Sequence, residues 1–184
     1  MPLSLTSTKV IKPLWPSPLT GRLYGSLLSI GALATGAVAI DTLYATPIGI
    51  SLAVTLTVLG IEVTTGAAGN VRIGIYRYSA GAPGALLVDS GAISTATPAA
   101  FKSAAISLAI VPDVYCLTAV FSATPTVRML TAASCLHGLG SSSGTDTNIH
   151  AGISVAFTYA ALPDPFPAGS ALYTGNFPNL LFGP

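Results

Sequence analysis

Four residues within one glycine- and serine-rich stretch are of types that bind metal ions: Cys135, His137, Asp146 and His150. A thiolate, two imidazoles and a carboxylate could together form a tetrahedral zinc site. Their spacing matches no established zinc motif, and histidines in a loop of this composition are more often solvated or in contact with another protein. We therefore expect no metal site.

Residues that could perform acid–base or nucleophilic catalysis are few and scattered. The chain has two histidines and six acidic residues, and the acids are spread singly along it. It contains neither the HExxH zinc motif nor a close pair of acidic residues. We therefore expect no catalytic residues, no cofactor and no enzymatic activity.

The glycine-rich stretch VRIGIYRYSAGAPGALLVDSG, residues 71–91, raises the question of a phosphate-binding loop. It lacks both the G-x-G-x-x-G sequence of dinucleotide sites and the Gly-Lys-Ser/Thr ending of a Walker loop. Apolar residues alternate with other residues over 71–76, which indicates a half-buried strand. Pro83, Gly81 and Gly84 favour a turn over residues 79–84. We predict two strands joined by a turn, with no ligand.

The same period-two alternation runs through the rest of the chain and predicts an all-β fold. Between residues 52 and 63 the apolar positions change phase near Gly60, which indicates a β-bulge or a corner. The long polar stretch 136–148 is predicted to be a surface loop. Seven to nine short strands favour an antiparallel β-sandwich of jelly-roll type. Further strands are expected over residues 36–40, 43–50, 101–110, 113–122, 126–132 and 150–160.

Composition limits the partners of this sandwich. Only 7% of the residues are charged, 51% are hydrophobic, and the net charge is +1. Such a chain has too few charges to keep a large surface soluble by itself, so we expect much of it to face other protein. Because it has no basic cluster, nucleic acid and membrane surfaces are poor partners. The uncharged run 23–40 is diluted by Gly, Ser and Thr and is a weak transmembrane candidate.

The ends of the chain differ from its middle because both are rich in proline. We predict a sandwich over residues 22–161 between two extended arms, residues 1–21 and 162–184. The apolar side chains of the arms either lie on a neighbouring subunit or fold back on their own domain. The candidates for subunit contacts are Trp15, Phe166, Tyr173, Phe177 and Phe182. Of the two cysteines, Cys116 lies in an apolar strand and is expected to be a buried thiol rather than half of a disulfide with Cys135.

Three motifs between residues 71 and 91 resemble a family, the structural proteins of tailed bacteriophages that form tail fibres, head fibres and decoration proteins. They are R-[IL]-G-I-Y at Arg72–Tyr76, G-x-P-G-x-L at Gly81–Leu86 and D-x-G at Asp89–Gly91. An LYA-x-P-like strand at 43–47 precedes them, and residues 115–119 are similar to a Y-W-L-A strand, with Cys116 at the usual Trp and Thr118 inserted. The resemblance covers roughly residues 38–122.

This resemblance implies a non-enzymatic virion protein that is assembled in the host cytoplasm. A capsid decoration or cement protein fits best, with the major capsid protein or other virion proteins as partners and a homotrimer as the expected assembly. The alternative is a tail or fibre component, either an adaptor or a receptor-binding module, although no rod-forming repeat is present. A carbohydrate-binding or carbohydrate-active protein is a remote third class. Arg72 could pair with Asp89, contact a subunit or face solvent.

Overall fold

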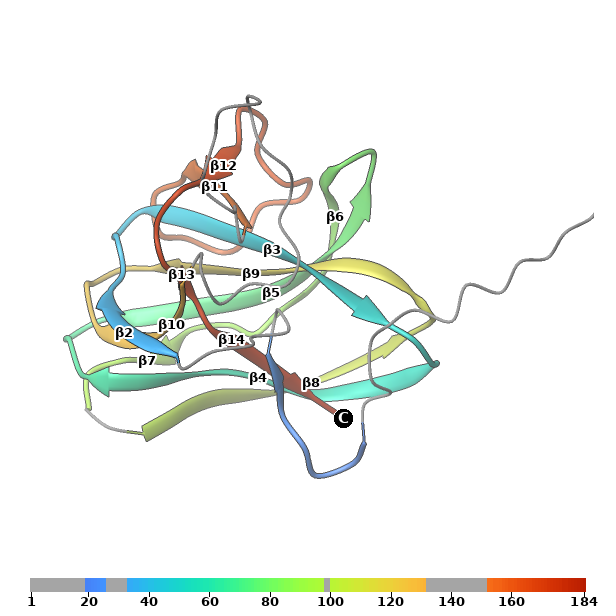
Figure 1. Ribbon diagram of the computed structural model, residues 1–184, viewed down its shortest axis with the longest axis horizontal. Helices are drawn as coiled ribbons and strands as arrows, with labels where there is room; N and C mark the ends of the chain where they lie inside the picture. Colours follow the sequence, from blue (N-terminus) through green and yellow to red (C-terminus); the bar gives the residue numbers. More distant parts are fainter. Residues whose placement is uncertain (1–18, 26–32, 98–99, 132–151) are drawn as a thin grey trace, which may run out of the picture.

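The structure, a computed structural model, describes residues 19–25, 33–97, 100–131 and 152–184, and all regular elements within them are β-strands (Figure 1). The strands are β1 (Tyr24–Gly25), β2 (Ala34–Ala37), β3 (Thr42–Ile50), β4 (Val54–Thr65), β5 (Asn70–Ser79), β6 (Ala82–Asp89), β7 (Ile93–Ser94), β8 (Ala100–Ile110), β9 (Asp113–Phe121), β10 (Thr126–Leu130), β11 (Gly152–Ala156), β12 (Ala171–Tyr173), β13 (Phe177–Pro178) and β14 (Leu180–Gly183). No helix among these residues is long and apolar enough to cross a membrane.

The strands form two antiparallel sheets packed face to face. The β4 sheet has the order β1-β14-β4-β10-β13, with β8 paired to β4 and β2 paired to β10. The β9 sheet has the order β12-β11-β3-β9-β5-β6, with β7 paired to β5. The prediction of an all-β antiparallel sandwich is confirmed.

The core lies between the two sheets and consists of the inward side chains of both. On β5 the residues Ile73 and Ile75 are fully buried there, as is Val63 on β4. Arg72 and Glu62, their neighbours in sequence, are only partly buried and lie on the opposite faces of their strands. Period two therefore predicted correctly which residues of these strands face inward.

The change of phase in β4 is confirmed, but it lies before Gly60. Leu56 is buried, and the buried apolar positions then continue at Leu59 and Ile61. The pairing with β8 shifts register between Leu56 and Val58. Gly60 has a different role, because the Phe101 ring lies where a side chain of residue 60 would be.

The turn after β5 is shorter than predicted. Strand β5 ends at Ser79 and β6 begins at Ala82, so Pro83 and Gly84 belong to the strand. The turn residues Ala80 and Gly81 have φ angles of 53° and 85°. Positive φ at both central residues is typical of the two-residue turns that match the twist of paired strands.

The predicted C-terminal arm, residues 162–184, is part of the sandwich, which corrects the expectation that it has no strand. Strand β12 pairs with β11, β13 pairs with β10, and β14 pairs with β4. These strands are only two to four residues long, which is too short for an alternation to be visible in the sequence. Most of the predicted N-terminal arm, and the predicted loop 136–148, lie outside the described residues.

Candidate functional site

The outer face of the β9 sheet is covered by residues 157–166, which we term the strap. Its apolar side chains join a second cluster on the side of the sheet away from the main core. Four alternating residues in and after β11 share one face, because all of them pack on this cluster: Ile153, Val155, Phe157 and Tyr159. The β9 sheet is thus buried on both faces. The cluster itself consists of Leu43, Ala45, Tyr76, Cys116, Val120, Leu162 and Phe166.

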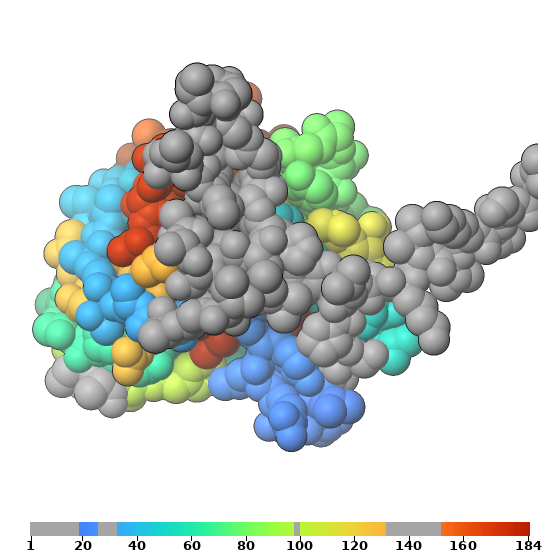
Figure 2. Space-filling view, in the orientation of Figure 1, coloured from blue at the N-terminus to red at the C-terminus, as the bar shows by residue number. Residues whose placement is uncertain are grey.

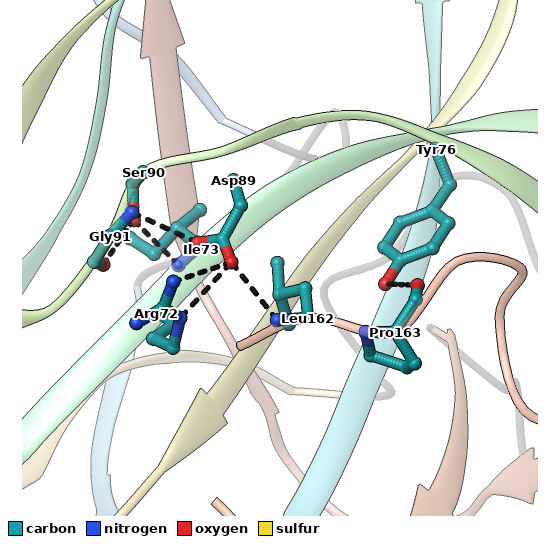
Figure 3. Close-up of polar contacts among 8 residues, drawn as sticks. All are labelled: Arg72, Ile73, Tyr76, Asp89, Ser90, Gly91, Leu162 and Pro163. Atoms are coloured by element: carbon teal, nitrogen blue, oxygen red, sulfur yellow. Dashed lines mark hydrogen bonds and ion pairs between the residues drawn. The ribbon is translucent and has the colours of Figure 1, made fainter. Parts of the chain in front are cut away.

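One carboxylate holds the middle of the strap (Figure 3). Oδ2 of Asp89 accepts hydrogen bonds from Nε and Nη2 of Arg72 at 3.0 and 2.7 Å, and from the main-chain N–H of Leu162 at 2.9 Å. Oδ1 accepts the N–H of Gly91 at 2.9 Å. The hydrogen bond to Asp89 also raises the pKa of Arg72. The sequence left three possibilities for Arg72: an ion pair with Asp89, a contact with a subunit, or a side chain facing solvent. The structure shows the ion pair.

Tyr76 and β6 hold the rest of the strap. The Tyr76 hydroxyl donates to the carbonyl of Pro163 at 2.7 Å (Figure 3). Its ring meets the ring of Phe166 edge to face, with centroids 5.3 Å apart. The N–H of Phe166 donates to the carbonyl of Gly84 at 2.9 Å, and the N–H of Leu86 donates to Oδ1 of Asp164 at 3.0 Å.

The sequence motifs between residues 71 and 91 are therefore explained by packing within the chain. Arg72 and Asp89 form the ion pair, and Tyr76 bonds the strap. Gly74 leaves the space that Leu162 occupies, and Gly91, with φ of 73°, follows the turn that begins at Asp89. These motif residues shape the sandwich and its strap, and they line no ligand pocket among those described.

Three of the groups with shifted pKa values are enclosed in the hydrophobic clusters. Burial raises the pKa of the Cys116 thiol and that of the Tyr44 hydroxyl, each to about 12. Burial also raises the pKa of Tyr76, with smaller contributions from the charges of Asp89 and Asp164. All three side chains are neutral near pH 7 and lie in the hydrophobic clusters. A nucleophile would need the opposite shift and access to solvent.

The candidates for subunit contacts are placed differently from the prediction. Phe177 and Phe182 are buried in the main core of their own chain, and Phe166, the last residue of the strap, is buried in the second cluster. Tyr173 is partly buried and packs edge to face on Tyr44 and Phe177. The expectation that these side chains lie on a neighbour is corrected to the alternative, that they fold back. Trp15 lies outside the described residues.

The possible metal ligands Cys135, His137, Asp146 and His150 also lie outside the described residues. Within the part that the structure describes, no group of three His, Cys, Asp or Glu residues could hold a metal ion. Cys116 is a buried thiol without a disulfide partner, as expected from its apolar strand.

The surface carries large apolar side chains that the sequence analysis did not single out. Three of them, which we term the apolar end, lie where β3 leads into β4 and where β8 leads into β9, on the right in Figures 1 and 2. They are Leu52, Val111 and Val114, with 56%, 60% and 39% of their surface exposed. Their signal in the sequence is weak, because single apolar residues near turns are common. A shallow hollow of about 390 Å³ lies beside them, lined by Ala53, Val54, Thr55, Ala109, Ile110 and Val111.

A second hollow of about 520 Å³ lies on the outer face of the β4 sheet. Its polar part is the ion pair between Nε of Arg128 and Oε1 of Glu62, 3.0 Å apart. Leu23, Leu181 and Phe101 form its apolar walls. Both hollows are open and mostly apolar, which suits contact with protein better than binding of a small polar ligand.

No protein-family model and no curated protein matches the chain.

Proposed function

We propose that this chain is a non-enzymatic structural protein of a tailed-bacteriophage particle and acts as a capsid decoration or cement protein. The observation that carries the proposal is the surface of the sandwich. Large apolar side chains are exposed at its end, on the outer face of the β4 sheet and near β1, while only 7% of all residues are charged. Such a surface favours permanent contacts with other protein subunits.

The resemblance of residues 38–122 to phage structural proteins supports the same role. In this chain the motif residues build a sandwich and hold its strap, which is the role of a scaffold. A jelly-roll type of sandwich is part of the proposal. It is supported by the way β3 and β4 pair with β9 and β8 respectively, so that one long hairpin-like pair folds over both sheets.

A cement protein stabilises a shell by bridging neighbouring capsid subunits, and the major capsid protein is the partner proposed here. The C-terminal segment pairs with strands of its own chain. The proposed contacts with capsid subunits are therefore made by the exposed apolar side chains and by the N-terminal segment that contains Trp15. The proposed assembly in the particle is a homotrimer, and the proposed location is the virion.

The test is to locate the chain in particles of the phage that encodes it. Antibody labelling viewed by electron microscopy should cover the head, and particles that lack the chain should lose DNA at lower temperature. Purified chain added back should restore both label and heat resistance. Label confined to the tail would replace the proposal with a tail or fibre component, and particles without label would overturn a virion role.

A further inference from the structure

Strand β8 forms the outer edge of the β4 sheet in the part of the chain that the structure describes. It pairs with β4 along almost its whole length, from Ala100 opposite Val63 to Ile110 opposite Val54. No other described strand pairs with it. Figure 1 shows it along the lower border of the fold. At eleven residues it is about twice the usual strand length.

In the β9 sheet, the edge formed by β6 is partly covered by the strap. The outer strand there, β6, has main-chain groups bonded by the strap, through Phe166 to Gly84 and Asp164 to Leu86. Isolated proteins protect such edges with charges, proline or covering segments, because unpaired main-chain groups invite another strand. Strand β8 has no proline, and its one charged residue is Lys102.

The side chains of β8 suit close approach of a second strand. From Phe101 to Ala109, exposed and partly buried residues alternate, also across the register shift. Five of the six exposed positions of the strand hold only serine or alanine, and the sixth is Phe101 near the start of the strand. The small exposed residues are Ala100, Ser103, Ala105, Ser107 and Ala109.

We infer that β8 pairs antiparallel with β8 of a second copy of this chain about a two-fold axis, so that the β4 sheet continues across two subunits. An antiparallel pair of identical strands is self-complementary, so one surface serves both partners. With full overlap the axis passes at Ala105, and Ser103 lies opposite Ser107. Phe101 lies opposite Ala109, beside the hollow of about 390 Å³ at that end of the strand.

Charge favours this arrangement over a parallel one. In the antiparallel pair Lys102 lies opposite Leu108, so the two lysines are six residues apart, or about 20 Å. That distance exceeds the screening length of about 8 Å at physiological salt. A parallel pair in register would place the lysines directly opposite each other, which is destabilising.

The inference concerns β8 alone and does not depend on a role in the virion. A trimer has no two-fold axis, so a trimer of this chain would need a second interface. Pairing through β8 would then join two trimers into six chains. The purified chain should therefore contain an even number of copies.

The test uses the full chain and charges placed on the edge. The unmodified protein should show a mass of two or six chains by sedimentation and native mass spectrometry. The double variant S103K/S107K puts lysines opposite lysines and should weaken pairing more than about tenfold. The variant S103K/S107E puts each lysine opposite a glutamate and should pair within about threefold of the unmodified chain.

A matched control places two lysines on the neighbouring inner strand β4, at Thr57 and Thr65, which are exposed but lie neither on the edge nor in the hollow beside Phe101. T57K/T65K should leave pairing within about threefold of the unmodified protein. Circular dichroism checks that each variant is folded. Hydrogen exchange of the unmodified chain needs no variant. The β8 amides that do not bond to β4, about every second one over residues 100–110, should be protected when the chain is associated and exchange faster on dilution.

Several results would overturn the inference. They are a stable mass of one or three chains, equal weakening by S103K/S107K and S103K/S107E, or equal weakening by T57K/T65K. Unchanged exchange on dilution of the β8 amides that do not bond to β4 would also overturn it.

Discussion

Leu162 packs directly on Gly74, in the middle of β5. A Cβ atom on residue 74 would overlap Cδ1 of Leu162 and would lie 2.8 Å from the main-chain oxygen of Val88. The backbone of β5 and the strap, almost ninety residues apart in sequence, are therefore fitted to each other through the absence of one side chain. Gly74 is the central glycine of the R-I-G-I-Y motif.

The first prediction is that Gly74→Ala destabilises the protein by about 1 to 3 kcal/mol, because either the strap or β6 must move to admit the methyl group. Gly84→Ala is the matched control, since a Cβ atom there would lie 3.7 Å from its nearest neighbour, the main-chain oxygen of Arg77. Urea unfolding followed by fluorescence measures both. Equal stabilities for the two variants would contradict the packing described here.

The second prediction separates the two ion pairs of the described residues. Asp89→Asn should cost about 1 to 3 kcal/mol, because the amide cannot accept all the hydrogen bonds of Oδ2 and leaves Arg72 partly buried without its counter-charge. In Glu62→Gln the cost should stay below about 0.5 kcal/mol, since the side chains of that pair are 38% and 44% exposed. Urea unfolding of both variants measures the two costs. A larger loss of unfolding free energy in Glu62→Gln than in Asp89→Asn would contradict the prediction that the Arg72–Asp89 pair contributes more to stability.

The sandwich could be predicted from the sequence because its long strands are half-buried and alternate. Strand β8 alternates over nine residues and β4 on both sides of its phase change, so that period two is visible in them. In β5 and β9 both faces are buried over several residues, and the large apolar residues themselves mark the strands. The phase change in β4 was visible for the same reason, although its position was displaced by a few residues towards Gly60.

The C-terminal strands could not be predicted in this way. Phe177 and Phe182 are core residues because they pair with β10 and β4, which lie far away in sequence. Strands this short show no period, and a proline-rich segment with isolated aromatics has the same composition whether it folds back or extends to a neighbour. The ion pair of Arg72 was one of three alternatives for the same reason, since its partner is set by tertiary pairing.

The third prediction follows from that correction. A chain that ends before β12, at residue 170, should fail to fold, because it loses β12, β13 and β14 and the core side chains that β13 and β14 carry. Phe177→Ala alone should cost about 3 to 5 kcal/mol, whereas Phe101→Ala, at a side chain 39% exposed, should cost about 1 kcal/mol or less. Circular dichroism and urea unfolding test both. A folded truncated chain of unchanged stability would restore the interpretation of residues 171–184 as an arm.

The fourth prediction concerns stability at alkaline pH. Burial raises the pKa of Cys116 from 9.0 to about 12, so the folded state keeps the thiol protonated while the unfolded state ionises it above pH 9. The stability tied to the neutral thiol is therefore fully present below pH 9 and is lost as the pH rises towards 12. Tyr44, whose pKa burial raises from 10.0 to about 12, adds a second loss above pH 10.

The variant Cys116→Ala isolates the thiol, because it removes the ionisable group and leaves Tyr44 in place. Alanine leaves a small cavity and lowers the stability of the variant at all pH values. The contribution of the thiol is seen in how steeply the unfolding free energy falls with pH. Between pH 7.5 and pH 10 the unmodified chain should lose about 1 kcal/mol more of its unfolding free energy than the variant does. Urea unfolding at both pH values measures this, with Cys135→Ser in both chains so that no second thiol titrates. Parallel losses in the two chains would mean that Cys116 ionises in the folded state as readily as in the unfolded one, and that the second hydrophobic cluster admits water.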